Sequence, residues 1–142
     1  MRIVLDASVA LKWFHTESDT PRADAIRTAL MEGTISVRVP DLILYELTNA
    51  LVWKVKTDPR LAIEMLTAIE QLPWLIITPT QKILKTAATI ASEYKISVYD
   101  ATYVALITDD SDRKLVTADE KLIAKLQHPQ IIHLNAFETQ TK

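Results

Sequence analysis

The sequence contains no cysteine and only one glycine, Gly33, among its 142 residues. Without cysteine the chain forms neither a disulfide nor a thiolate metal site, which is compatible with a reducing compartment. No apolar run approaches the roughly 20 residues that a helix needs to cross a bilayer. We therefore expect a cytoplasmic protein with no membrane partner.

Several catalytic signatures are absent as well. The sequence has no GxSxG nucleophile elbow, and its histidines, His15, His128 and His133, show no HExxH or paired-ligand spacing. The formal charge of −2 is not the basic signature of a typical nucleic-acid binder. Lys12 and Arg38 can be considered for phosphate contacts, but we expect solvated surface positions for both.

Length and composition predict one folded domain. The 142 residues, of which 49% are hydrophobic, suffice for a core without disulfides or structural metals, so we expect a single domain over 1–142. Apolar periodicity predicts strands that alternate with helices, an arrangement that implies right-handed crossovers and a parallel sheet covered on both faces. The expected strands are 2–5, 36–39, 74–78, 114–116 and 131–134. The expected helices are 8–14, 20–32, 41–55, 60–71, 80–95, 98–109 and 119–127.

Two acids follow strands of this expected sheet. Asp6 closes the apolar run 2–5, and Asp119 follows the run 114–116 after two further residues. In open α/β sheets, ligands bind beyond the carboxyl ends of the strands, so both acids are candidates for a site. Two helical acids join them: Asp100 in the first turn of its helix, and Glu46 within a mostly apolar stripe where an unpaired carboxylate is costly to bury.

Each acid also has a purely structural explanation. Asp6 suits an N-cap, Ser97 to Asp100 fits a capping box, and Thr117 to Glu120 fits a second one. Attraction to a positive helix start accounts for Asp119. A buried salt bridge to Lys or Arg is the alternative for Glu46, which is neither a cap nor on an obviously solvated face.

The acids taken together favour a divalent metal site. Unit charges about 4 Å apart repel by roughly 4 kcal/mol at an effective dielectric constant near 20, so converging carboxylates must protonate, separate or bind a cation. Mg²⁺ and Mn²⁺ prefer oxygen ligands, and Mg²⁺ keeps several waters and needs only one or two direct carboxylates.

The motifs around these acids resemble those of PIN-domain ribonucleases, especially VapC-type toxins. The matching segments are Leu5-Asp6-Ala7-Ser8, Pro40 to Leu51 with Glu46 and Asn49, Ser97-Val98-Tyr99-Asp100-Ala101, and Leu115-Val116-Thr117-Ala118-Asp119. The resemblance spans essentially the whole chain. It implies a three-layer α/β/α PIN-like fold with a central, mainly parallel five-stranded sheet in the order 3-2-1-4-5.

The resemblance also implies an activity and partners. Asp6, Glu46, Asp100 and Asp119 would be catalytic residues that hold Mg²⁺ or Mn²⁺, with Thr117 and Asn49 as supporting polar groups. The implied function is metal-dependent endoribonuclease cleavage of RNA by a toxin that has a cognate antitoxin and commonly forms a homodimer. A metal-bound water can attack phosphorus, so no protein nucleophile is needed.

The sequence departs from the family pattern at two places. Relatives often have glycine in the turn before Ser97, where this chain has Tyr94-Lys95-Ile96, so this turn must adopt another conformation or accept left-handed strain. Some relatives carry a further acid just beyond the last motif, but Glu120 and Lys121 follow Asp119 here. A second metal site is therefore not expected to be well formed.

Two rival functions fit parts of the pattern. A Mg²⁺-binding phosphoacceptor signalling domain also has an acid after its first strand, but it needs an Asp at the end of the middle strand, where this chain has Thr78-Pro79. A catalytically inactive PIN-like interaction module is the second rival, and the presence of all four acids argues against it.

Overall fold

The structure is a computed structural model in which residues 1–56 and 58–139 are described. Its strands form one five-stranded sheet in the order β3-β2-β1-β4-β5, with every neighbouring pair parallel. The strands are β1 (Arg2–Leu5), β2 (Ser36–Pro40), β3 (Leu75–Ile77), β4 (Lys114–Thr117) and β5 (Ile131–His133). The predicted fold class and strand order are therefore confirmed.

The two central strands are apolar because helices cover them on both faces. Ile3, Val4 and Leu5 of β1 and Leu115 and Val116 of β4 have no exposed surface. An apolar run without alternation is the pattern of such a doubly covered strand. β1 lies between β2 and β4, so the residue that follows it, Asp6, is placed near the middle of the sheet's carboxyl edge.

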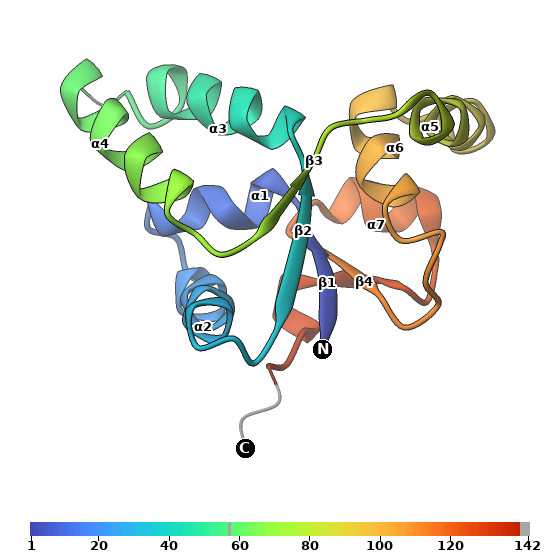
Figure 1. Cartoon of the computed structure of the whole chain (residues 1–142), viewed down its shortest axis with the longest axis horizontal. Coiled ribbons are helices and arrows are strands. Elements are labelled where there is room, and N and C mark those ends of the chain that lie inside the picture. The colour runs from blue at the N-terminus through green and yellow to red at the C-terminus, as the bar shows by residue number, and fades with distance from the viewer. Residues whose placement is uncertain (57, 140–142) are drawn as a thin grey trace.

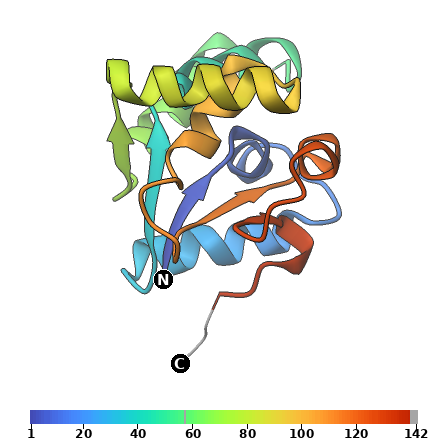
Figure 2. The same cartoon turned by 90° about the vertical axis from the view of Figure 1, so that its right-hand side faces the viewer.

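The helices lie in two layers (Figures 1 and 2). One face of the sheet carries α1 (Ala7–Ala10), the 3-10 helix η1 (Leu11–Trp13), α2 (Thr20–Met31), α3 (Leu42–Trp53) and α4 (Pro59–Glu70). The other carries α5 (Gln81–Tyr94), α6 (Val98–Ala105) and α7 (Glu120–Leu126), and a short 3-10 helix, η2 (Leu134–Ala136), follows β5. None of the described helices is both long enough and apolar enough to cross a membrane.

Two predicted helices differ from the observed ones by more than two residues at an end. The segment predicted as one helix over 8–14 is a single α-helical turn that tightens into η1, where the Trp13 indole N–H donates to the Ala23 carbonyl at 2.8 Å. α6 stops at Ala105 rather than at 109. The chain continues in turns whose amides bond three residues back, as in Leu106 to Tyr103 and Ile107 to Val104, and such bonds are common where helices end.

The turn without glycine between α5 and α6 uses a left-handed residue. Lys95 has φ of 56° and ψ of 47°, and the amides of Lys95 and Ile96 both donate to the Ala91 carbonyl. Glycine usually occupies such a helix end because a side chain there is strained. The Lys125 ammonium donates to the Lys95 carbonyl at 2.9 Å and ties the turn to α7. Of the two alternatives for this turn, the chain adopts the left-handed conformation at Lys95, and Ser97 then caps α6.

Candidate metal centre at the carboxyl edge of the sheet

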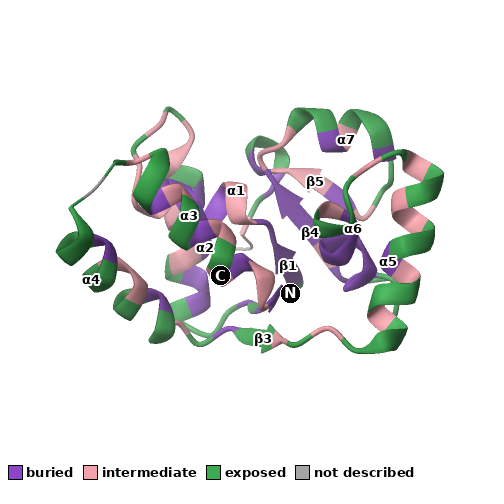
Figure 3. Ribbon diagram, turned by 90° about the horizontal axis from the view of Figure 1, so that it is seen from above, coloured by how far each residue is buried: buried purple, intermediate pink, exposed green. Residues whose placement is uncertain are grey.

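The four acids lie on, or directly before, the helices α1, α3, α6 and α7. Figure 3 looks onto the carboxyl edge of the sheet, with α3 and α6 on opposite sides of β1 and α1 between them. Asp6 follows β1, Glu46 lies on α3, Asp100 lies on α6, and Asp119 precedes α7. The winding of the chain thus carries acids from four distant segments to one edge of the sheet.

Asp6 is buried and held by two hydroxyl groups. Asp6 is only 8% exposed. Its Oδ2 accepts hydrogen bonds from Ser8 Oγ and Thr117 Oγ1, each at 2.6 Å. Ser8 Oγ in turn accepts the Ala118 amide at 3.0 Å. Asp6 occupies the N-cap position of α1 but makes no side-chain capping bond. Helix capping therefore does not explain this acid.

Burial raises the pKa of Asp6 above its ordinary value. The hydrogen bonds from Ser8 and Thr117 act in the opposite direction because they stabilise the charged form, and the negative charge of Asp100 raises the pKa further. A nearby cation would therefore stabilise the charged form of Asp6.

Glu46 is a partly buried acid without a cationic partner. Burial raises its pKa to about 7, the Tyr103 hydrogen bond opposes that shift, and the charges of Asp6 and Asp100 add to it. Tyr103 donates its hydroxyl hydrogen to Glu46 Oε2 at 2.5 Å. Within the described residues, no Lys, Arg or His forms a salt bridge with Glu46. The salt-bridge alternative for this residue is therefore wrong.

Asp100 combines a capping motif with a place near the other acids. Its amide donates to Ser97 Oγ at 3.0 Å, which is one half of the predicted capping box. Its charge raises the pKa values of both Asp6 and Glu46. Asp6, Glu46 and Asp100 therefore act on one another electrostatically.

Asp119 is oriented differently from the other three acids. It is the N-cap of α7, and its Oδ1 accepts the amides of Lys121 at 2.9 Å and Leu122 at 3.0 Å. The predicted capping box beginning at Thr117 is wrong, because Thr117 is the last residue of β4 and Asp119 itself caps the helix. The Asp119 amide donates to Thr117 Oγ1 at 3.0 Å, so Asp119 connects to Asp6 through that hydroxyl.

Comparison with known proteins agrees with this architecture. The PIN domain family model matches residues 3–127. The chain belongs to the PIN domain family. No match was found among curated proteins.

Solved structures with the same PIN fold come from several organisms. PAE2754 from Pyrobaculum aerophilum is 21% identical with a TM-score of 0.66, over 95% of this chain and 90% of that one. VapBC2 from Rickettsia felis, bound to a DNA fragment from their promoter, is 15% identical with a TM-score of 0.65, over 94% and 97%. VapC20 from Mycobacterium tuberculosis, a toxin that cleaves the sarcin-ricin loop, is 17% identical with a TM-score of 0.67, over 86% and 93%. At these identities the likeness establishes the fold.

The two residues expected to support the acids occupy different environments. Thr117 is fully buried and bonds directly to Asp6. Asn49 lies on the exposed side of α3, where it lines a surface hollow with Tyr45 and Trp53. A hydrogen bond thus joins Thr117 to Asp6, whereas Asn49 is an exposed residue three positions after Glu46 on α3.

Sequence reasoning did not single out two polar contacts in this PIN domain. Ser8 lies two residues after Asp6, and its hydroxyl and that of Thr117 both donate to Asp6 Oδ2. Tyr103 lies three residues after Asp100, a spacing that puts both side chains on one face of α6. The helical spacing was a usable signal for Tyr103, but nothing in the sequence alone assigns its hydroxyl to Glu46.

The chemistry of these oxygen donors fits a hard divalent cation. No three His, Asp or Glu side chains in the described part of the chain are grouped tightly enough to surround an ion. Mg²⁺, however, needs only one or two direct carboxylates together with water. None of the four acids forms a salt bridge among the described residues, and Asp6 and Glu46 both have raised pKa values. A bound cation would reduce the repulsion between these carboxylates and stabilise their charged forms.

Lys12 is not a surface cation. Its ammonium pairs with Glu17 and with Asp19, at 2.8 Å from Asp19 Oδ1, and the residue is 8% exposed. The expectation of a solvated position is therefore wrong. Arg38 is partly exposed and lies 3.4 Å from Asp109, so its charge is also directed to an acid.

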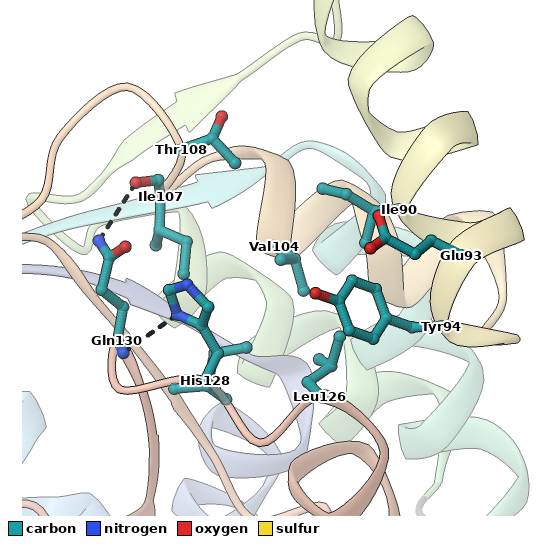
Figure 4. A pocket seen from close by; sticks show the side chains of 10 residues that line it. Ile90, Glu93, Tyr94, Val104, Ile107, Thr108, Leu126, His128 and Gln130 are labelled. Carbon is teal, nitrogen blue, oxygen red and sulfur yellow. Dashed lines mark hydrogen bonds between the residues drawn. The ribbon is translucent and has the colours of Figure 1, made fainter.

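A separate cavity of about 310 Å³ opens between α5, α6 and α7 (Figure 4). Ile90, Tyr94, Val104 and Leu126 supply its apolar lining, and His128 Nδ1 accepts the Gln130 amide at 3.2 Å. None of the four acids lines this cavity. The candidate metal centre is thus distinct from it.

Proposed function

We propose that this PIN domain is a metal-dependent endoribonuclease that hydrolyses RNA phosphodiester bonds. The observation that carries the proposal is the group formed by Asp6, Glu46 and Asp100, three carboxylates from different segments that interact electrostatically and have no salt-bridge partner in the described part of the chain. Perturbed titratable groups of this kind are characteristic of functional sites. They would hold Mg²⁺ or Mn²⁺ together with Asp119.

The protein's own residues would orient the ligands. Ser8 and Thr117 fix one oxygen of Asp6, and the two α7 amides fix Oδ1 of Asp119. Asn49, three residues after Glu46 on α3, would support the site from that helix. When bound, a divalent cation lowers the pKa of a coordinated water and stabilises the charge that develops on the phosphate oxygens. The acids would supply the negative charge that attracts the cation and the arrangement of oxygen atoms that holds it.

We further propose that the protein is the VapC-type toxin of a toxin-antitoxin pair and acts in the cytoplasm as one domain over 1–142. The proposal rests on the sequence motifs and on the structural likeness to VapBC2 and VapC20. An antitoxin protein and a second copy of the toxin would be its partners. An inactive interaction module would have no need for uncompensated acids, which oppose folding when no cation is present.

Cleavage of RNA tests this function. Purified protein incubated with total cellular RNA should produce discrete fragments in Mg²⁺ or Mn²⁺ and none in EDTA, and fresh Mg²⁺ should restore cleavage. Intact RNA under every metal condition would contradict the nuclease assignment. Co-expression with the protein encoded by the adjacent reading frame tests the toxin assignment separately, since a cognate antitoxin should suppress cleavage.

A further inference from the structure

Tyr103 is a buried phenol in contact with the candidate metal centre. The residue is 1% exposed and is among the largest fully buried side chains of the described core. Its hydroxyl is nevertheless directed at a polar group, since it donates to Glu46 Oε2 at 2.5 Å. This bond joins α6 to α3 across residues that are 57 positions apart in the chain.

The phenol keeps its proton at ordinary pH and can donate it in a hydrogen bond to Glu46. Burial raises the pKa of Tyr103, and the charge of Glu46 and the hydrogen bond to it raise that pKa further. The proton therefore stays on the phenol, and Glu46 Oε2 is the acceptor. A hydrogen bond from a neutral hydroxyl to a carboxylate is short and stronger than a bond between two neutral groups.

Among the described residues, Tyr103 is the one hydrogen-bond donor to the Glu46 carboxylate. Glu46 lies on the part-buried face of α3, and the negative charges that act on it, those of Asp6 and Asp100, push its carboxylate away. No basic side chain among the described residues opposes that push with a salt bridge to Glu46. Without the phenol, the flexible Glu46 side chain would turn toward solvent.

We propose that Tyr103 is a positioning residue that holds the Glu46 carboxylate facing Asp6 and Asp100, so that the acids are arranged before a cation arrives. That Tyr103 orients Glu46 is inferred from their hydrogen bond alone. That this orientation strengthens metal binding rests on the proposed function. The alternative is a purely structural role, in which the Tyr103 hydroxyl bonds to Glu46 only because a buried hydroxyl needs a hydrogen-bond partner, as is common for buried tyrosines.

Tyr103→Phe separates these roles because it keeps the ring in the core and removes only the hydroxyl. Tyr94→Phe is the matched control, since Tyr94 lines the separate cavity of Figure 4. Titration calorimetry with Mn²⁺ should show about 10- to 100-fold weaker binding for Tyr103→Phe, the usual loss when a residue that orients a ligand is changed. Tyr94→Phe should bind as the wild type does. Equal affinities of Tyr103→Phe and wild type would overturn the proposal.

Crystal structures in EDTA test the positioning without any metal. In wild type, Glu46 should face Asp6, and in Tyr103→Phe its carboxylate should be turned away or have no single position. A Glu46 side chain that stays in place in Tyr103→Phe overturns the proposal. If wild type takes up no Mn²⁺, the proposed function fails, but this structural comparison still decides whether Tyr103 positions Glu46.

Discussion

Asp6→Asn should lower metal-dependent RNA cleavage by more than about a hundredfold while the protein remains folded. Changes to residues that merely orient a metal ligand already cost about 10- to 100-fold, so loss of a ligand's charge should cost more. Asn is nearly isosteric with Asp, and its side-chain oxygen can still accept the bonds from Ser8 and Thr117. Initial cleavage rates at saturating Mg²⁺ measure the effect.

The fold of this variant should be at least as stable as the wild type without metal. Burial raises the pKa of Asp6, which means that the folded protein disfavours the charge there, and Asn carries none. Asp24→Asn is a matched control, because Asp24 is a surface residue of α2 that pairs with Arg27. Cleavage by Asp6→Asn at the rate of Asp24→Asn, with equal thermal stability, would remove Asp6 from the active site.

The affinity for Mn²⁺ should rise steeply with pH between about 5 and 7. A carboxylate must lose its proton to bind a cation, and burial holds the pKa of Glu46 at about 7. Each proton released on binding changes the affinity by about tenfold per pH unit, so Glu46 alone accounts for up to about a hundredfold over this range. Calorimetric titrations at several pH values measure this dependence. A flat profile would show that Glu46 does not bind the cation.

The same shift predicts the opposite trend for the stability of the metal-free protein. Because the folded pKa of Glu46 is raised, the unfolded chain loses this proton first as pH rises from about 4.5, and the contribution of Glu46 to stability is lost by about pH 7. Other acids titrate as well, so the wild type must be compared with Glu46→Gln. In EDTA the difference in melting temperature should grow in favour of Glu46→Gln as pH rises through this window. A difference that is independent of pH would contradict the raised pKa.

Much of the fold could be predicted because local sequence patterns indicate its strands and helices. The unbroken apolar run of β1 predicts a central strand, and the strand-helix alternation predicts a parallel sheet. The strand order came from the resemblance to PIN domains and not from these patterns. The end of α6 could not be predicted, because the residues after Ala105 stay buried and continue the apolar pattern in turns that replace the helix.

The approach of Asp6, Glu46 and Asp100 to one another could be predicted from the sequence, but their hydrogen-bond contacts could not. Both Asp6 and Asp119 precede helices, and only tertiary structure shows that Asp119 caps its helix whereas Asp6 turns to Thr117. The bond between Tyr103 and Glu46 joins side chains of two helices, and its geometry depends on how α3 and α6 pack. Periodicity does not specify that packing.

Anomalous diffraction from wild-type crystals soaked in Mn²⁺ tests the central claim most directly. We predict an anomalous peak at the carboxyl end of β1, in direct contact with an Asp6 oxygen and with Glu46 and Asp100 bound to it directly or through water. Fully soaked crystals with no peak at this edge, or with Mn²⁺ only at other acids, would contradict it.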